Sequence, residues 1–66
     1  MTRRDELRDA LKESGVTVTF LAAYLGCTRN RIYAILNGSE CKASEIVKIT
    51  EALHLNQEQR DHIFLG

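Results

Sequence analysis

Apolar side chains recur at spacings of three and four residues along most of the chain, which is the pattern of helices with one buried face. Leu7, Ala10 and Leu11 form the first such stripe, and Ile32, Ile35 and Leu36 form another. Alternation of β-branched residues is confined to the short run "VTVTF" at 16–20. The pattern therefore predicts an all-α fold.

Five helices are predicted, over residues 3–14, 18–25, 29–37, from 42–45 to 53, and 57–64. Gly15 and Gly38 can supply the left-handed residue that ends the first and the third of these helices. No proline, linker or internal repeat divides the chain, so residues 1–66 are interpreted as one domain.

Most of the predicted helices follow a residue whose side chain can accept a hydrogen bond from the free N–H groups of the first turn. The predicted N-caps are Thr2, Thr17, Thr28 and Asn56. Asp5 gives Thr2 a weak form of the capping box, and Gln59 completes a box with Asn56.

Length and composition narrow the class of function. A chain of 66 residues buries only about 60% of its unfolded surface and is too short to enclose a large substrate pocket, which argues against an enzyme. No run approaches the roughly 20 apolar residues of a membrane span, and the charged start "MTRRDELRD" is unlike a signal peptide. A cytoplasmic location is expected.

The residue types that carry catalysis or metal binding in other proteins form no recognisable motif in this sequence. Cys27 and Cys41 are far apart and are interpreted as reduced thiols. Together with His54 and His62 they fit no standard zinc spacing. No catalytic triad or phosphate-cradling glycine loop is evident. We therefore expect no catalytic residue, no metal and no cofactor.

The net charge is zero, but the charges are unevenly distributed. Residues 1–14 carry four basic and four acidic side chains, residues 15–44 have a net charge of plus two, and residues 45–66 have a net charge of minus two. The middle segment is thus the positive part of the chain.

Only the three residues "GCT", at 26–28, separate two of the predicted helices. A link this short favours a sharp bend at Gly26 and a wide crossing angle, as in a helix-turn-helix unit. Burial of Ile32 and Ile35 leaves Arg29, Asn30 and Tyr33 on the open face of the second helix. Such a helix fits the DNA major groove, where Arg suits guanine and Asn suits adenine.

Each of these residues also has a simpler interpretation. Arg29 and Arg31 could belong to a solvated face or pair with Glu40 or another acid, and Asn30 could be plain polar surface. Tyr33 could pack against a neighbouring helix. Phe64 and Leu65 are interpreted as core or dimer contacts.

The run "VTVTFLAAYLGCTRNRIYAILNGSE" resembles the helix-turn-helix of the lambda-repressor and Cro type, also called xenobiotic-response-element-like. The matching features are Leu21-Ala22, Gly26, Thr28, Ile32, Ile35 and Asn37-Gly38. The following "SEIVKITEALHLNQEQ" is similar to the fourth helix of that family and the cap of its fifth. The resemblance covers about residues 5–64 and implies a compact five-helix domain.

The resemblance also implies roles for single residues. It places Arg29, Asn30, Tyr33 and Ala34 at base-contacting positions, and Thr17, Thr19, Thr28 and Asn37 where the family contacts phosphate. We add Arg31, and Lys42 in the loop before the fourth helix, as candidate phosphate contacts. Many members have Gln after the cap of the second helix, whereas this chain has Val18.

The expected function is a DNA-binding transcriptional regulator of the phage-repressor or Cro type, acting as a homodimer on an inverted-repeat operator. Neutral charge predicts few phosphate contacts per subunit, because counterion release scales with the phosphates that are neutralised. The alternative is a protein-interaction modulator of the same fold that binds a partner repressor. The neutral charge and the lost Gln favour that alternative.

Overall fold

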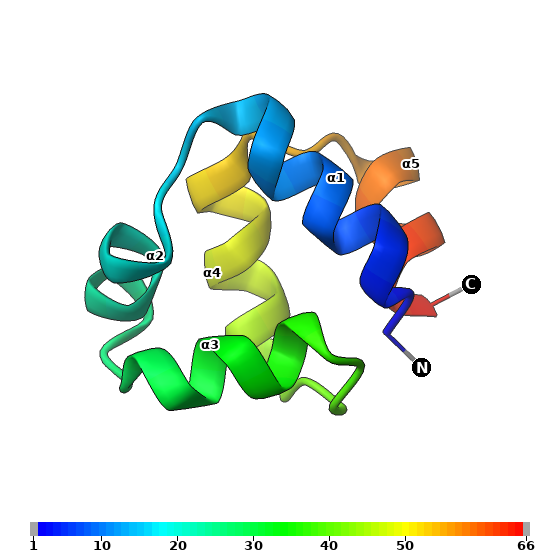
Figure 1. Cartoon of the computed structure of the whole chain (residues 1–66). Helices are drawn as coiled ribbons and strands as arrows, with labels where there is room; N and C mark the ends of the chain where they lie inside the picture. The colour runs from blue at the N-terminus through cyan, green and yellow to red at the C-terminus, as the bar shows by residue number, and fades with distance from the viewer. Residues whose placement is uncertain (1, 66) are drawn as a thin grey trace.

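Helical segments make up most of the part of the chain that the computed structural model describes, residues 2–65 (Figure 1). They are α1 (Arg4–Ser14), α2 (Val18–Leu25), α3 (Arg29–Leu36), α4 (Ala43–Leu53) and α5 (Gln57–Arg60), followed by the π-helical turn η1 (Asp61–Leu65). The expected all-α, five-helix architecture is confirmed. No helix within residues 2–65 is both long and apolar enough to cross a membrane.

The core is built from the apolar stripes of all the longer helices. Leu7 of α1, Leu21 of α2, Ile32 and Ile35 of α3, and Ile49 of α4 are fully buried. Apolar contact of this kind is the main stabilising contribution in a domain this small. The helices are therefore held together by the residues that the periodicity singles out.

The C-terminal apolar residues divide between core and surface. Ile63 and Phe64 are buried in the same cluster as the helices, whereas Leu65 is 68% exposed. The predicted helix over 57–64 remains α-helical only to Arg60 and continues as the wider turn η1. Within this turn, the adjacent side chains Ile63 and Phe64 both reach the core.

Three of the predicted N-caps are confirmed. The Thr17 hydroxyl accepts a hydrogen bond from the backbone N–H of Phe20 at 3.0 Å, and the Thr28 hydroxyl accepts from Arg31 N–H at 3.3 Å. Asn56 and Gln59 each accept from the other's backbone N–H, which is the predicted capping box. These bonds satisfy N–H groups that a helix start leaves without a partner.

The predicted cap of α1 is wrong. Arg3 occupies the N-cap position without a side-chain capping bond, and the box with Asp5 does not form. Thr2 is buried, and its hydroxyl donates to the Ser39 carbonyl at 3.1 Å. A tertiary contact to the segment after α3 thus takes the hydroxyl that local spacing assigns to a cap.

The turn between α2 and α3 forms as predicted. Gly26 adopts a left-handed conformation with φ 74°, and the N–H of Cys27 donates to the Ala22 carbonyl at 3.0 Å. The chain bends at once into Thr28 and α3. Consequently α2 and α3 lie across each other instead of forming an antiparallel hairpin (Figure 1).

Candidate nucleic-acid interface

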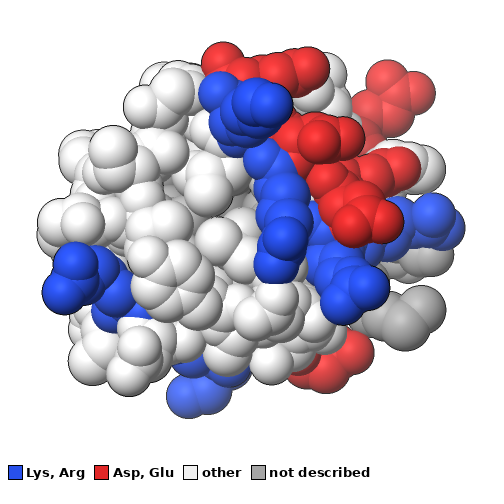
Figure 2. Space-filling view, viewed as in Figure 1, with Lys and Arg blue, Asp and Glu red and all other residues white. Residues whose placement is uncertain are grey.

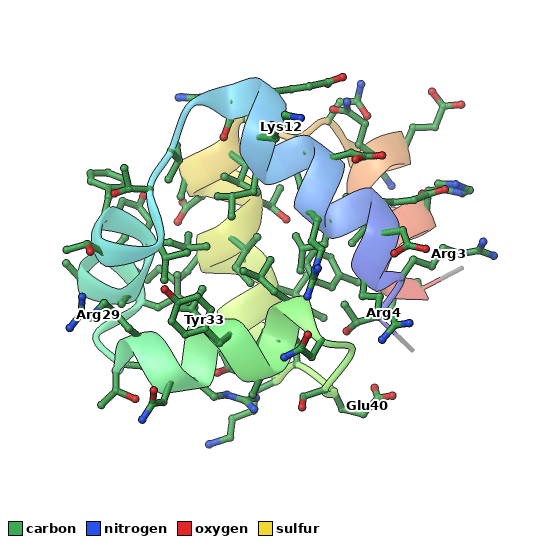
Figure 3. The ribbon with its side chains drawn as sticks, viewed as in Figure 1. Arg3, Arg4, Lys12, Arg29, Tyr33 and Glu40 are labelled. Atoms are coloured by element: carbon green, nitrogen blue, oxygen red, sulfur yellow. The ribbon has the colours of Figure 1, made fainter. Side chains whose placement is uncertain are left out.

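One face of α3 is buried and the other is open to solvent. Ile32, Ile35 and Leu36 belong to the core, whereas Arg29 and Asn30 are exposed and Tyr33 is 51% exposed. Figure 3 shows Arg29 at the start of α3 and Tyr33 one turn further along. The open face therefore carries three of the four side chains that were predicted to contact bases, namely Arg29, Asn30 and Tyr33. Ala34 is only partly exposed and lies at the edge of this face.

The electrostatic surroundings of the α3 N-terminus favour an anion. Neither α2 nor α3 has an acidic residue in its first turn. The free N–H groups and the dipole of a helix start attract negative charge. Within residues 2–65, the Arg29 side chain forms no ion pair. This guanidinium is therefore available to an external partner.

Arg31 has a structural partner that the sequence did not identify. Its Nε donates to Glu45 Oε2 at 2.9 Å and its Nη2 donates to Glu45 Oε1 at 2.7 Å. Nη2 also donates to the backbone carbonyl of Glu40 at 2.9 Å. Of the two interpretations, pairing with an acid is therefore observed, and Arg31 fastens α3 to the start of α4. Its contact with phosphate stays a prediction.

This pairing changes the titration of both groups. The hydrogen bonds from Arg31 are the main cause that lowers the pKa of Glu45 from 4.5 to about 2, against the opposing effect of burial. The same hydrogen bonding raises the pKa of Arg31. The pair is ionised throughout the physiological range, and its charges are turned toward each other.

The predicted phosphate-contact residues lie at the ends of helices and are accessible. Thr17 and Thr19 are exposed at the start of α2, and Thr28 is exposed at the start of α3. Lys42 is exposed immediately before α4, where its backbone N–H donates to Glu45 Oε1 at 2.8 Å. The positions are therefore compatible with backbone contacts, which stay a prediction.

Arg8 of α1 was not identified from the sequence, although it completes the other end of α3. Its Nε donates to the Leu36 carbonyl at 3.0 Å and its Nη2 donates to Asn37 Oδ1 at 2.6 Å. A cation at a helix C-terminus satisfies carbonyl groups that have no partner within the helix. Asn37, a predicted phosphate contact, is thereby oriented by α1. Spacing along the chain gives no signal for this contact.

A second exposed feature lies on α2. The rings of Phe20 and Tyr24 stack with centroids 5.9 Å apart, and both side chains are exposed. Lys48 Nζ of α4 lies 5.4 Å from the centroid of the Tyr24 ring, a cation–π geometry. Sequence analysis did not identify this aromatic pair.

Among residues 2–65, the thiols and histidines form no cluster that could hold a metal ion. Cys27 and Cys41 are free thiols, each partly buried. Burial raises the pKa of the Cys41 thiol, which makes it less reactive. Across residues 2–65, no group of three or more His, Cys, Asp or Glu side chains is placed to hold a metal ion.

Comparison with known proteins agrees with this geometry. A family model described as "Helix-turn-helix domain" matches residues 4–63, which include all five α-helices. Searches of curated proteins and of solved structures find no match. The match covers most of the sequence and agrees with the resemblance to the lambda-repressor and Cro type. The chain belongs to the helix-turn-helix domain family.

Proposed function

We propose that this domain binds duplex DNA sequence-specifically through α3 and regulates transcription by occupying an operator. The observation that carries the proposal is the open face of α3, which presents Arg29, Asn30 and Tyr33 beside a capped helix start without acids. An α-helix fits the major groove, and residues in its N-terminal turns reach base edges.

The side chains of this face suit different contacts. Arg29 can donate two hydrogen bonds to guanine O6 and N7, and Asn30 can bond adenine N6 and N7. Tyr33 and the small Ala34 suit a thymine methyl group. Thr17, Thr19, Thr28, Asn37 and Lys42 are assigned to phosphates, with Arg31 as a further contact. Phosphate contacts fix the orientation of the protein, and base contacts carry the specificity.

The balanced charge supports a homodimer on an inverted repeat. With a net charge of zero, one subunit neutralises few phosphates, and two subunits double that number. Two-fold symmetry would present two α3 helices to half-sites about 34–36 Å apart. The operator is accordingly expected to be a palindrome with half-sites about one helical turn apart.

The direct test is selection of binding sites from random duplex DNA at low salt. The wild-type protein should enrich a palindromic site, and Arg29→Ala and Asn30→Ala should each relax one position of it. Loss of a bidentate base contact costs about 1–3 kcal/mol, or roughly 5- to 150-fold in discrimination. Arg60→Gln is the matched control, because this cation lies on α5 and pairs with Asp61. Absence of any enrichment by the wild-type protein would contradict the proposal.

The alternative, a modulator that binds a partner repressor, is favoured by the exposed Phe20–Tyr24 pair. Aromatic residues that are accessible on one side are enriched at protein interfaces. The two functions separate in the same selection experiment. A modulator would enrich no duplex, and its binding to a purified partner repressor would be lost on Phe20→Ala. A DNA-binding regulator would retain enrichment in that variant.

A further inference from the structure

The charges of α1 are sorted by sign into two stripes. Arg4, Arg8 and Lys12 recur every four residues and form what we call the basic stripe. Asp5, Asp9 and Glu13 recur at the same spacing one position later and form the acidic stripe. Residues four apart lie on the same side of a helix. In Figure 2, the basic residues form a band across the visible face, with the acidic residues gathered beside it.

The spacing of like charges within each stripe does not favour the stability of α1 itself. Like charges at positions i and i+4 destabilise a helix, and each stripe contains two such pairs. Opposite charges do occur three apart, as in Asp5–Arg8 and Asp9–Lys12. Within residues 2–65, however, neither combination forms an ion pair, and the Arg4 and Lys12 side chains have no acidic partner. The stripe therefore leaves positive charge uncompensated on one side of the helix.

The basic stripe lies against the end of α3. Arg8 bonds the Leu36 carbonyl and the side chain of Asn37. The Cδ atom of Arg4 lies 4.0 Å from the position that a Cβ atom on Gly38 would occupy. Figure 3 shows Arg4, Lys12 and Tyr33 on the same side of the molecule, with Arg29 beyond Tyr33. The stripe thus adjoins the C-terminal end of α3 and lies on the same side of the molecule as Tyr33.

We propose that the basic stripe binds phosphates of the DNA strand that borders the groove occupied by α3. The inference rests on the proposed function and adds a strand contact outside the helix-turn-helix unit. Arg4 and Lys12 are eight residues apart, about 12 Å along the helix. Each DNA strand carries one charge per roughly 3.4 Å of axis, so this length spans several phosphates. Charge complementarity and the contact with the end of α3 make duplex DNA the occupant.

The inference also explains how a chain without net charge can approach DNA. Arg4, Lys12 and Arg29 lie on one side of the molecule (Figure 3), while the acidic stripe lies on an adjacent side of α1. Such a separation of charge orients the domain in the field of a polyanion. The charge of the whole chain therefore understates the charge of the face that approaches the duplex.

The test is the salt dependence of duplex binding, measured by fluorescence anisotropy on a selected site and on a scrambled duplex. The proteins compared are the wild type, R4Q, K12Q, the double variant R4Q/K12Q, and the control D9N on the acidic stripe. Arg8 is left intact because it holds the end of α3. Circular dichroism verifies that each variant keeps the helical content of the wild type.

Each lost phosphate contact makes the negative slope of log K against log salt shallower by about 0.9. We expect the slope to be shallower by about 0.9 in R4Q and in K12Q, and by about 1.8 in the double variant. The affinity for both duplexes should fall by the same factor, because phosphates carry no sequence information. D9N should keep or strengthen binding.

Three results would contradict the inference, and they differ in what they imply for the proposed function. If the wild type enriches a site while R4Q/K12Q keeps its slope, the basic stripe does not bind phosphate, although the proposed function stands. A loss confined to the selected duplex would assign the stripe to base contacts and would also overturn the inference. If the wild type binds no duplex, the inference and the proposed function fail together.

Discussion

Arg31 and Glu45 form a two-pronged ion pair that joins α3 to α4, with Nε–Oε2 and Nη2–Oε1 distances of 2.9 and 2.7 Å. Glu45 Oε1 also accepts the Lys42 N–H, so one carboxylate binds α3 and helps to start α4. The planar fork of an arginine matches a carboxylate in this way, which a lysine cannot do. The pair fixes α3 relative to the loop that carries Lys42.

Acidification should weaken the fold through Glu45. Its pKa is about 2 in the folded chain and 4.5 as an ordinary carboxyl group. Because the folded value is the lower one, the stabilisation is complete above pH 4.5 and is lost as the pH falls through about 2. The difference in pKa corresponds to roughly 3 kcal/mol, and partial exposure of Arg31 reduces this to about 2 kcal/mol.

Urea unfolding of the wild type and of Glu45→Gln at pH 7 and at pH 3 measures this contribution. The difference in unfolding free energy between the two proteins should shrink at the lower pH. Equal differences at both pH values would show that the carboxylate contributes nothing through its charge. The other carboxylates are present in both proteins and cancel in the comparison.

Arg8→Gln should destabilise the domain by about 1 kcal/mol. The substitution removes the hydrogen bonds to the Leu36 carbonyl and to Asn37 Oδ1, which complete the end of α3. Thermal unfolding is the measurement, and a loss of this size lowers the Tm by about 4–8 °C in a domain this small. Lys12→Gln, on the same stripe but without such a contact, should change the Tm little; an equal fall would refute the assigned role.

Thr28→Ala should cost about 1 kcal/mol, because the N–H of Arg31 loses its acceptor at the start of α3. Thr28→Ser retains the hydroxyl and serves as the control. Chemical denaturation of the three proteins compares them directly. The capping role is excluded if the serine variant is as unstable as the alanine variant.

Gly26→Ala should destabilise the domain by about 1 kcal/mol, because the backbone conformation at this position disfavours a residue with a side chain. The residue has φ 74°, and a Cβ atom added there would meet nothing within 4 Å. Gly26→Asn should cost less, because Asn tolerates the left-handed region better than Ala does. Calorimetry of both variants checks the order; a more stable alanine variant would contradict the explanation.

Local signals in the sequence predicted most of the helices and their ends. The threonine caps, the glycine stops and the stripes of α3 act within one or two helical turns, so sequence spacing specifies them. The same spacing predicted which side chains the open face of α3 carries. Where a helix start has no such signal, the prediction was less complete: the start of α4 was placed only within 42–45, and the helix begins at Ala43. Its end at Leu53 was predicted, although the capping residue with φ 55° is His54 and not a glycine.

Sequence spacing did not predict the contacts between residues that are distant along the chain. Thr2 has the spacing of a cap, but it is buried and its hydroxyl donates to the Ser39 carbonyl. Arg31 was a candidate DNA contact, but Glu45, fourteen residues away, pairs with it. Arg8 belongs to a charged face of α1, yet it completes the end of α3.

By itself, the sequence determined the all-helical class, the bend at Gly26 and the exposed face of α3, because these depend on local conformation and on burial of apolar stripes. Only the tertiary structure decided which charged groups are neutralised within the fold and which face outward. The spacing of Arg4, Arg8 and Lys12 was visible in the sequence, but not that the basic stripe adjoins α3. The relative placement of the helices depends on packing of the whole core, and no single segment of the sequence specifies that packing.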